Sequence, residues 1–375
     1  MSLFLSPDAT RTILLSDLRI KPYEVKQILE VKIEQEINKH ATLFCRGLLV
    51  EGTDFSYIQQ DSVGRNISLM VENHGDQEAI LFQGIVKEIE VKVIDGSYYL
   101  EVHGISYSSL LDIMRKERSF QDKAMSYTQL VREVTATYPG AAVNDVVSNG
   151  KPIEQFLVQY LETDWEFLKR LAADFNTGLV CDPRFDTPKY CFGIPQVQSV
   201  TLDCFNYSVK KNIHRFKSLS ENGIDHLTEN DFICYDVETA AVLNIGDQVQ
   251  FQGKQLQVAS YMRINRQELF LNQYNLMPAN GLSQPECIHH QIVGCSFGGH
   301  VIDIRNDQVK VHLDIDETQD IATARYLPYS TIYSSPDGSG WYCMPELNDR
   351  VRVYFPDGND DHAYAISSVH EPVVG

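Results

Sequence analysis

Hydrophobic and polar residues alternate with a period of two over most of this chain, a pattern that is typical of β-strands. It is clearest in residues 23–111, 201–284 and 285–375. In the first region the tetrapeptide Ile94-Asp95-Gly96-Ser97 separates two alternating runs and predicts a hairpin. In the second region, residues 244–264 predict another hairpin.

The pattern becomes mixed between residues 112 and 200. The segment SYTQLVREVTATYPG predicts a helix that ends at Pro139-Gly140. In EQFLVQYLETDWEFLKRLAADFNTGLV (154–180), alternating Phe156, Val158 and Tyr160 predict a strand, and Gly178 is expected as a C-cap or turn residue. The apolar face of the helix between them is expected to hold Leu161, Trp165, Leu168, Leu171, Ala172 and Phe175.

The start of that helix carries a capping box. Thr163 and Glu166 are spaced so that each side chain can bond the backbone amide of the other, and Asp164 adds negative charge at the positive end of the helix dipole. An alternative interpretation is that Glu162, Asp164 and Glu166 form a catalytic cluster of acids. Capping and solvated charge are favoured, because those functions already account for acids at a helix start.

Composition narrows the class of protein. The chain has 375 residues and a formal charge of −19, from 51 acidic and 32 basic residues. This balance argues against nucleic acid or an anionic membrane as the main partner. The eight cysteines include no C-x-x-C pair, and the sequence has no signal-peptide pattern and no apolar run of membrane-spanning length. A cytoplasmic protein with reduced thiols, of about two to four domains, is expected.

Three polar clusters are candidates for chemistry. CIHHQIVGC (287–295) brings together two Cys and two His, but the adjacent His289 and His290 would point to opposite faces of a strand, which disfavours zinc. NYSVKKNIHRFKS (206–218) is either a docking patch for an acidic partner or, as favoured, the exposed face of a strand. PDGNDDH (356–362) predicts a turn and lacks the ligand order of an EF-hand. No catalytic, cofactor-binding or metal-binding residues are therefore assigned.

The last 90 or so residues predict about five strands, which is typical of a small closed barrel. This region resembles the oligomer-binding (OB-fold) barrel of VgrG spike proteins and contractile phage tail hubs. The segment VQYLETDWEFLKRLA resembles the hub signature of the same proteins, and GISYSSLLDIMRKERSFQD resembles the phage late control D branch. The matching positions taken as structural motif residues are Thr163, Asp164, Trp165, Glu166, Phe167, Leu168, Arg170, Gly299, Val301, Asp303, Pro345, Val351, Val353, Phe355 and Gly358. Further matches are Val309 to Val311, Met344, Ser368 and Val369.

The resemblance implies a mainly β fold with an α+β insertion, two barrel-like hub domains and a C-terminal OB-fold barrel. The expected domains are residues 1–111 (first hub barrel), 112–200 (α+β hub domain), 201–284 (second hub barrel) and 285–375 (OB-fold spike base). Two positions depart from the family pattern: Asn348 replaces a turn glycine, and His362-Ala363 replaces arginine-proline. The sequence stops at Gly375, directly after the barrel, so a separate PAAR-like tip protein is expected.

The function that the resemblance implies is structural. The expected protein is the trimeric central hub-spike of a contractile injection system, such as a tailocin, a phage tail-like particle or a secretion apparatus. Its partners would be the inner tube, baseplate wedge and tip proteins, with possible effector cargo, and membrane contact only through the tip. It would be assembled in the cytoplasm and would not be an enzyme. The alternatives are a tail-associated peptidoglycan hydrolase and a carbohydrate- or peptide-binding β-barrel protein.

Overall fold

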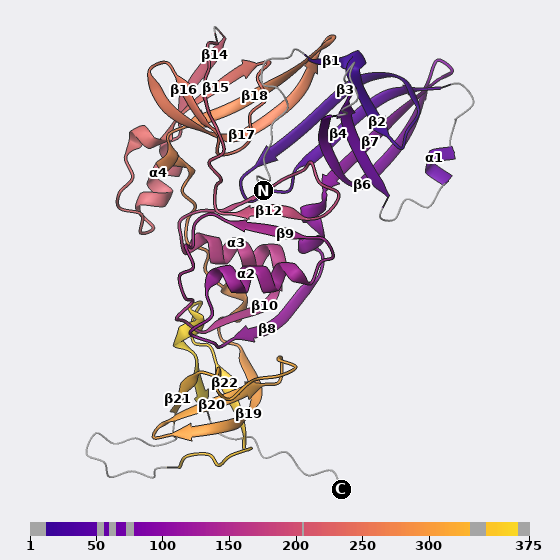
Figure 1. Cartoon of the computed structure of the whole chain (residues 1–375). Helices are drawn as coiled ribbons and strands as arrows, with labels where there is room; N and C mark the ends of the chain where they lie inside the picture. Colours follow the sequence, from indigo (N-terminus) through magenta and orange to yellow (C-terminus); the bar gives the residue numbers. More distant parts are fainter. Residues whose placement is uncertain are drawn as a thin grey trace. The chain divides into compact units, whose positions relative to one another are not determined.

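The computed structural model describes residues 13–50, 56–59, 65–72, 79–204, 206–330 and 343–366 (Figure 1). Most of the described secondary structure is β-strand, so the predicted fold class is confirmed. The chain divides into two compact units. The first holds Met1–Leu111, Thr135–Val147 and Leu171–Glu286, and the second holds Asp112–Val134, Ser148–Arg170 and Cys287–Gly375. The finer division into four domains stays a prediction, and the motif matches Ser368 and Val369 lie outside the described residues.

One continuous 13-stranded sheet forms the framework of the described first unit. Two sets of six strands make up most of it, and the short β1 (Ile13–Leu14) pairs with β18. The N-terminal set is β2 (Leu18–Lys21), β3 (Val25–Glu36), β4 (Thr42–Leu49), β5 (Asn66–Val71), β6 (Ala79–Ile94) and β7 (Ser97–Ser106). The later set is β13 (Ser199–Thr201), β14 (Tyr207–Lys211), β15 (Ile233–Thr239), β16 (Gln248–Phe251), β17 (Lys254–Arg266) and β18 (Leu269–Met277).

The two sets meet where β3 pairs with β17. Residues 32–36 of β3 run antiparallel to residues 260–264 of β17, and in the strand order these two strands lie between β4 and β18. We call this pairing the seam. The sequence suggests two barrel-like hub segments as separate domains, but their strands belong to one continuous hydrogen-bonded sheet.

Both predicted hairpins are confirmed. Ile94 faces Ser97 across the first turn, where Asp95 and Gly96 have φ values of 49° and 76°. The second turn joins β16 to β17 at residues 252–253, and both of its residues also have positive φ. Two successive residues with positive φ define the tight hairpin turns that suit the twist of the flanking strands, and this is why glycine occurs in each.

Smaller elements complete the two units. The predicted helix at residues 126–140 is α2 (Tyr127–Ala136), and Gly140 beyond it has a φ of 72°. The remaining elements outside the C-terminal barrel are α1 (Ser56–Gln59), β8 (Arg115–Phe120), β9 (Ala142–Asp145), β10 (Leu157–Thr163), α3 (Asp164–Ala173), β11 (Leu179–Cys181), β12 (Lys189–Phe192) and α4 (Ile213–Ser220). Strand β10 pairs with β8, and β12 pairs with both β11 and β9.

Two details predicted around α3 are wrong. Leu161 does not belong to the helix face: it lies in a bulge of β10, has a φ of 53° and is 38% exposed. Gly178 is not the residue that ends the helix, because Asn176 takes the left-handed conformation with a φ of 52°. The amides of Asn176 and Thr177 donate to the carbonyls of Ala173 and Ala172, in the pattern of a Schellman motif. A Cβ on Gly178 would lie 2.5 Å from the Asn38 side chain, so this glycine permits close packing instead.

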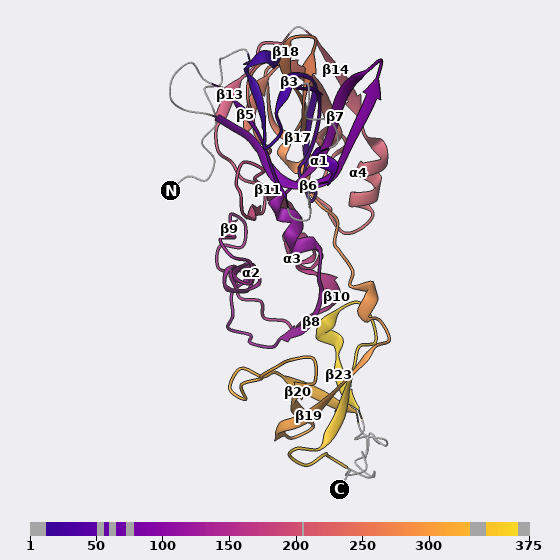
Figure 2. The ribbon, with the colours of Figure 1, turned by 90° about the vertical axis from the view of Figure 1, so that its right-hand side faces the viewer.

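The C-terminal part of the second unit is a closed five-stranded barrel, as predicted (Figures 1 and 2). Its strands are β19 (Ser296–Arg305), β20 (Gln308–Leu313), β21 (Tyr326–Ser330), β22 (Arg350–Tyr354) and β23 (Tyr364–Ile366). Inward alternation is confirmed on β22, where Val351 and Val353 are buried, and Phe355 follows them into the core. Asn348 has a φ of 70°, a conformation that asparagine tolerates, which explains how it replaces a turn glycine.

No disulfide joins any two of the eight cysteines, all of which lie within the described residues. No helix among the described residues is long and apolar enough to cross a membrane. Within the same residues, no group of three or more His, Cys, Asp or Glu side chains is arranged to hold a metal ion.

Candidate functional site: a buried ionic clamp on the C-terminal barrel

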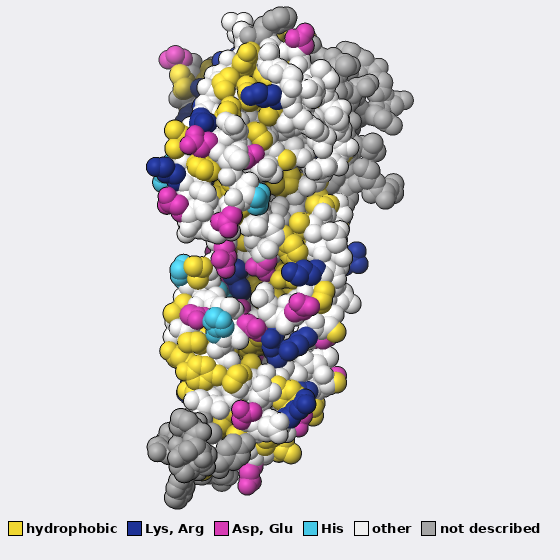
Figure 3. Space-filling view, turned by 90° about the vertical axis from the view of Figure 1, so that its left-hand side faces the viewer, with side chains coloured by type: hydrophobic (Ala, Val, Ile, Leu, Met, Phe, Trp, Pro, Cys, Tyr) yellow, Lys and Arg dark blue, Asp and Glu magenta, His cyan; other side chains and the backbone are white. Residues whose placement is uncertain are grey.

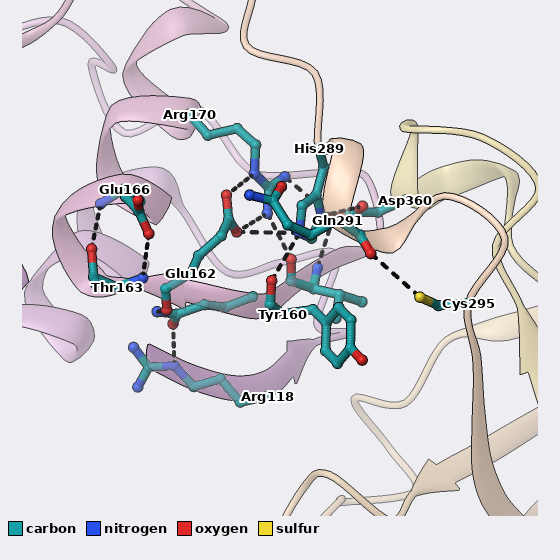
Figure 4. A network of polar contacts seen from close by, with 12 residues as sticks. Arg118, Tyr160, Glu162, Thr163, Glu166, Arg170, His289, Gln291, Cys295 and Asp360 are labelled. Atoms are coloured by element: carbon teal, nitrogen blue, oxygen red, sulfur yellow. Dashed lines mark hydrogen bonds and ion pairs between the residues drawn. The ribbon is translucent and has the colours of Figure 1, made fainter. Parts of the chain in front are cut away.

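The predicted capping box forms at the start of α3. The backbone amide of Thr163 donates to Glu166 Oε2 at 2.9 Å, and the amide of Glu166 donates to Thr163 Oγ1 at 3.1 Å. The Thr163 hydroxyl also donates to Asp112. The motif residues Thr163 and Glu166 therefore fix where β10 becomes α3 (Figure 4).

Asp164 does more than complement the helix dipole. Its side chain is completely buried and pairs with Lys116 Nζ at 2.5 Å and Arg118 Nη2 at 2.8 Å, both on β8. The Gln159 amide also donates to it at 3.0 Å. Burying a carboxylate is costly unless it is paired and hydrogen-bonded, and these contacts therefore tie the first turn of α3 to β8.

The next motif residue, Arg170, lies at the centre of a larger network. Its guanidinium makes a two-point pair with Glu162, with N–O distances of 3.0 and 2.9 Å. It also donates to the carbonyl of Val158 at 2.6 Å and to Asp360 Oδ2 at 3.3 Å. Asp360 lies 190 residues beyond Arg170 in the chain. This one arginine therefore links the α+β insertion, through β10 and α3, to the C-terminal barrel segment.

His289 and Asp360 complete this network (Figure 4). His289 Nδ1 lies 3.1 Å from Asp360 Oδ1, and its Nε2 lies 3.3 Å from the Tyr160 carbonyl and 3.5 Å from Glu162 Oε2. Asp360 also accepts from the amide of Val158 at 2.8 Å. We call Glu162, Arg170, His289 and Asp360 the barrel clamp. Each of the four side chains is at least nine-tenths buried.

Apolar packing surrounds the barrel clamp. Phe156 and Val158 of the insertion belong to the same buried core as the barrel residues, and the Phe156 and Phe355 rings stack at 5.9 Å. Tyr160 packs edge-on against Phe297 at 4.8 Å. The predicted strand forms as β10, but Phe156 lies just before it and the intervening Leu157 and Gln159 are also buried. The surface against which Phe156, Val158 and Tyr160 pack is the barrel.

A second set of contacts binds β8 to the barrel. Asp316 accepts from the amide and the hydroxyl of Ser119, each at 2.6 Å. Burial raises the pKa of Asp316 above its usual range, although these hydrogen bonds oppose the shift. Arg325 pairs with Asp361 at 2.6 Å, and Asp361 also accepts from the amide of Phe156 at 3.0 Å. Both edges of the β8–β10 pair thus contact the barrel segment through carboxylates.

The remaining motif residues maintain packing. Trp165, Phe167 and Leu168 are almost fully buried on α3, and Phe167 stacks on Phe120 with ring centroids 5.6 Å apart. In the barrel, Val301 and Pro345 are buried.

Two glycines of the barrel segment are required because neighbouring atoms lie too close to leave room for a side chain. A Cβ on Gly299 would lie 2.5 Å from the His312 carbonyl, and one on Gly358 would lie 2.4 Å from Ile288. Asp303 instead faces outward and accepts from the Tyr326 hydroxyl at 2.6 Å, a bond that holds the pKa of this carboxyl below its usual range.

Sequence reasoning misses two residues of the barrel clamp. The sequence suggests His289 only as a metal ligand on a strand, but this residue precedes the short 3-10 helix His290–Ile292. The sequence places Asp360 in a turn, but its side chain is buried, and the residue is 4% exposed. No local pattern marks either residue, because their partners lie far away in the sequence.

Two family models match the chain. The model described as "Phage tail baseplate hub (GPD)" matches residues 54–176, which include the capping box and Arg170. The model described as "Type VI secretion system/phage-baseplate injector OB domain" matches residues 299–370, which include Asp360. No curated protein sequence matches the chain.

Solved structures share the fold at low sequence identity. The Escherichia coli protein c3393, a type VI secretion system component, has a TM-score of 0.65 and 12% identity, covering 94% of this chain and 99% of that one. A chain of the half-lidded Francisella PdpA–VgrG complex has a TM-score of 0.55 and 9% sequence identity. The match covers 97% of this chain and 79% of that one. A tail protein of Neisseria meningitidis has a TM-score of 0.52 and 12% sequence identity. The match covers 73% of this chain and 98% of that one.

A hub segment joined to an injector-type OB barrel defines a baseplate hub-spike protein. The two matched segments, residues 54–176 and 299–370, carry the baseplate hub and injector OB-domain families that the sequence resemblance predicts. The chain is a structural hub-spike component of a phage tail or type VI secretion-type injection system.

Proposed function

We propose that three copies of this chain assemble around an axis as the central hub of the baseplate. The observation that carries this proposal is the seam, which joins two sets of six strands in each described chain. Three copies would present six related lobes, enough to seat a ring of six inner-tube subunits. Such a trimer closes through heterologous contacts, in which one surface meets a different surface of the next copy.

The net charge of −19 bears on how the copies would associate, because like-charged subunits repel one another. On the face shown in Figure 3, acidic and basic side chains are interspersed, and hydrophobic side chains form several separate groups. An obligate trimer of such subunits would bury about 2,000 Å² or more per interface. Assembly in the cytoplasm, followed by incorporation into the particle, remains our expectation.

The barrel clamp would act as the force-bearing joint of the second unit. A spike base must stay attached while the particle contracts, and the barrel clamp joins the insertion to the barrel by buried charges rather than by loops. The motif residues Asp164 and Arg170 of α3, and Thr163 directly before it, would serve this attachment and not catalysis.

Partners are proposed from the family and its relatives. Inner-tube and baseplate wedge proteins would contact the hub, and a separate PAAR-like protein would cap the barrel. One of the solved structures that share this fold is a complex of PdpA with VgrG, which supports contact between hubs of this kind and a further protein. Effector cargo is proposed on the same grounds.

We further propose that the chain is not a hydrolase. One observation favours the hydrolase alternative: a groove of about 370 Å³ in the first unit is lined by four carboxylates, Glu34, Glu36, Asp236 and Glu238. Each of them, however, pairs with a lysine or arginine at 2.6 to 2.9 Å.

The electrostatics of the groove also argue against an acid catalyst. Burial pushes the pKa of Asp236 upward, but hydrogen bonds from Lys210 and Asn275 outweigh it, so the pKa lies below the usual range. Gln273 and Arg266 hold the pKa of Glu238 low as well. A glycosidase acid needs a raised pKa to carry a proton near neutral pH.

Two experiments test these proposals. A reconstruction of the intact particle should place three copies of the chain on the axis; six copies, or a peripheral position, would reject the hub arrangement. Purified protein should release no soluble fragments from peptidoglycan. Release that disappears in the Asp236→Asn or Glu238→Gln variant would establish the hydrolase instead.

A further inference from the structure

Strand β14 forms one end of the large sheet in the first unit. In the strand order it is followed only by β15, and no described strand pairs with its other side. All five of its residues, Tyr207 to Lys211, are exposed. Figure 1 shows this strand next to its partner β15.

The register identifies which backbone groups face outward. The amide of Asn212 donates to the carbonyl of Phe232 at 3.0 Å, in line with the pairing of β14 and β15. Hydrogen-bonded pairs in an antiparallel ladder recur every second residue, so Ser208 and Lys210 also bond toward β15. The N–H and C=O groups of Tyr207, Val209 and Lys211 therefore point away from the sheet, where another strand could bond them.

The side chains of β14 favour a particular kind of strand. The Tyr207 ring packs edge-on against Phe251 at 5.2 Å, which anchors the start of the edge, while Val209 is 52% exposed. Lys210 and Lys211 follow, and residues 206–218 contain no acidic residue in a chain of charge −19.

Each of the two lysines is paired with one carboxylate, Lys210 with Asp236 at 2.8 Å and Lys211 with Glu229 at 2.9 Å. An ammonium group has three N–H donors, so each of these lysines can also donate to a second carboxylate that belongs to another protein.

Lysines on an edge strand also discourage indiscriminate pairing, because an apolar or basic strand would have to approach their charge. An acidic strand has no such obstacle. We propose that the outer edge of β14 binds an extended acidic segment of another protein, which adds to the sheet as a further strand. This inference does not depend on the trimer or on the barrel clamp.

The test uses the full chain and a labelled synthetic peptide in which Val and Thr alternate with Glu. Binding is measured by fluorescence anisotropy. We expect saturable binding to the wild-type chain, and about tenfold weaker binding to Val209→Pro, because proline removes one outward donor and its ring obstructs the incoming strand. Proline is tolerated at an edge position whose N–H faces solvent, so the sheet itself should persist.

Val209→Thr is the matched control, since it keeps the donor and the strand propensity and should bind like wild type. Circular dichroism and an unfolding curve check that both variants are folded. The double variant Lys210→Glu/Lys211→Glu should reverse the preference, binding a lysine-containing version of the peptide better than the glutamate version.

A peptide N-methylated on alternate residues keeps the charge but loses its donors, so it should bind about tenfold more weakly than the parent peptide, or weaker still. This measurement keeps the proposal testable even if Val209→Pro does not fold. Equal binding of the methylated and parent peptides, equal binding of acidic and basic peptides, or no binding at all would each overturn the proposal. Self-association of the chain that Val209→Pro abolishes, without peptide binding, would assign the edge to a second copy instead.

Discussion

The two units join distant parts of the chain in different ways. In the first, the seam is a ladder of backbone bonds between residues 32–36 and 260–264. In the second, the barrel clamp depends on four particular side chains, which are buried and joined by ion pairs and hydrogen bonds. A backbone ladder tolerates most side-chain changes because every residue except proline supplies the same donor and acceptor. A buried ion network tolerates few, because removing one member leaves its partners without compensation.

The largest expected effect is at the barrel clamp. Arg170→Ala leaves Glu162 and Asp360 buried without their arginine, so we expect a loss of about 3 to 5 kcal/mol in the free energy of unfolding. Chemical denaturation measures it. The matched control is Arg266→Ala, which removes an exposed ion pair with Glu238 and should change stability by less than about 1 kcal/mol. Equal effects of the two variants would show that the barrel clamp is no stronger than a surface pair.

The second prediction concerns the seam. Ile33 lies on β3 opposite Arg263 of β17 and is fully buried. The amide of Ser106 donates to the carbonyl of Ala41, and the alternation that follows through β4 directs the N–H of Ile33 toward β17. Ile33→Pro should destabilise the first unit by about 3 kcal/mol, because proline removes a donor from the seam. Ile33→Val keeps the backbone and should cost only about 1 kcal/mol in the same unfolding assay. If the valine variant were as damaging as the proline variant, side chains rather than the backbone would hold the seam.

A smaller effect is expected at the helix start. Thr163→Ala removes the hydroxyl that accepts from the amide of Glu166, and should lower thermal stability by about 1 kcal/mol. Thr163→Ser keeps the hydroxyl and serves as the control. A neutral Thr163→Ala would mean that the ion pairs of Asp164 alone fix the first turn.

The smallest effect is a dependence on pH at the barrel surface. The hydroxyl of Tyr326 holds the pKa of Asp303 below its usual range, so this carboxylate stabilises the folded protein at pH values above its unfolded pKa of about 3.9. The contribution is lost as the pH falls through the lower, folded value. Unfolding curves of Asp303→Asn and wild type should therefore differ slightly at pH values of about 7 and converge in acid. A difference that grows in acid would contradict the assigned bond.

Features that depend on neighbouring residues could be predicted from the sequence, whereas contacts between distant parts of the chain could not. Local signals were sufficient for the two hairpins, the capping box and the inward alternation of Val351 and Val353, because each depends on residues a few positions apart. The bulge at Leu161 was not predictable, since a leucine in a left-handed conformation has no pattern of its own. Asn176 takes the place of the expected Gly178 because asparagine also tolerates positive φ.

The barrel clamp was beyond local reasoning altogether. Arg170 and Asp360 are 190 positions apart, and nothing in the spacing of either segment specifies the other. Arg170 was identified only through the family resemblance, which gives a position but no partner. The seam was missed for the same reason, because alternation predicts that strands form but not which distant strands pair.

The order of the segments has a consequence for biosynthesis. A ribosome that adds about 5 to 20 residues per second needs about 10 to 40 s to travel the 190 positions from Arg170 to Asp360. During that interval Phe156 and Val158 have no barrel to cover them, while the residues that complete the first unit are being made. The emerging chain must keep an apolar strand, and an arginine that still lacks Asp360, out of wrong contacts until its final segment arrives. This stretch is therefore where a nascent-chain chaperone would be most needed.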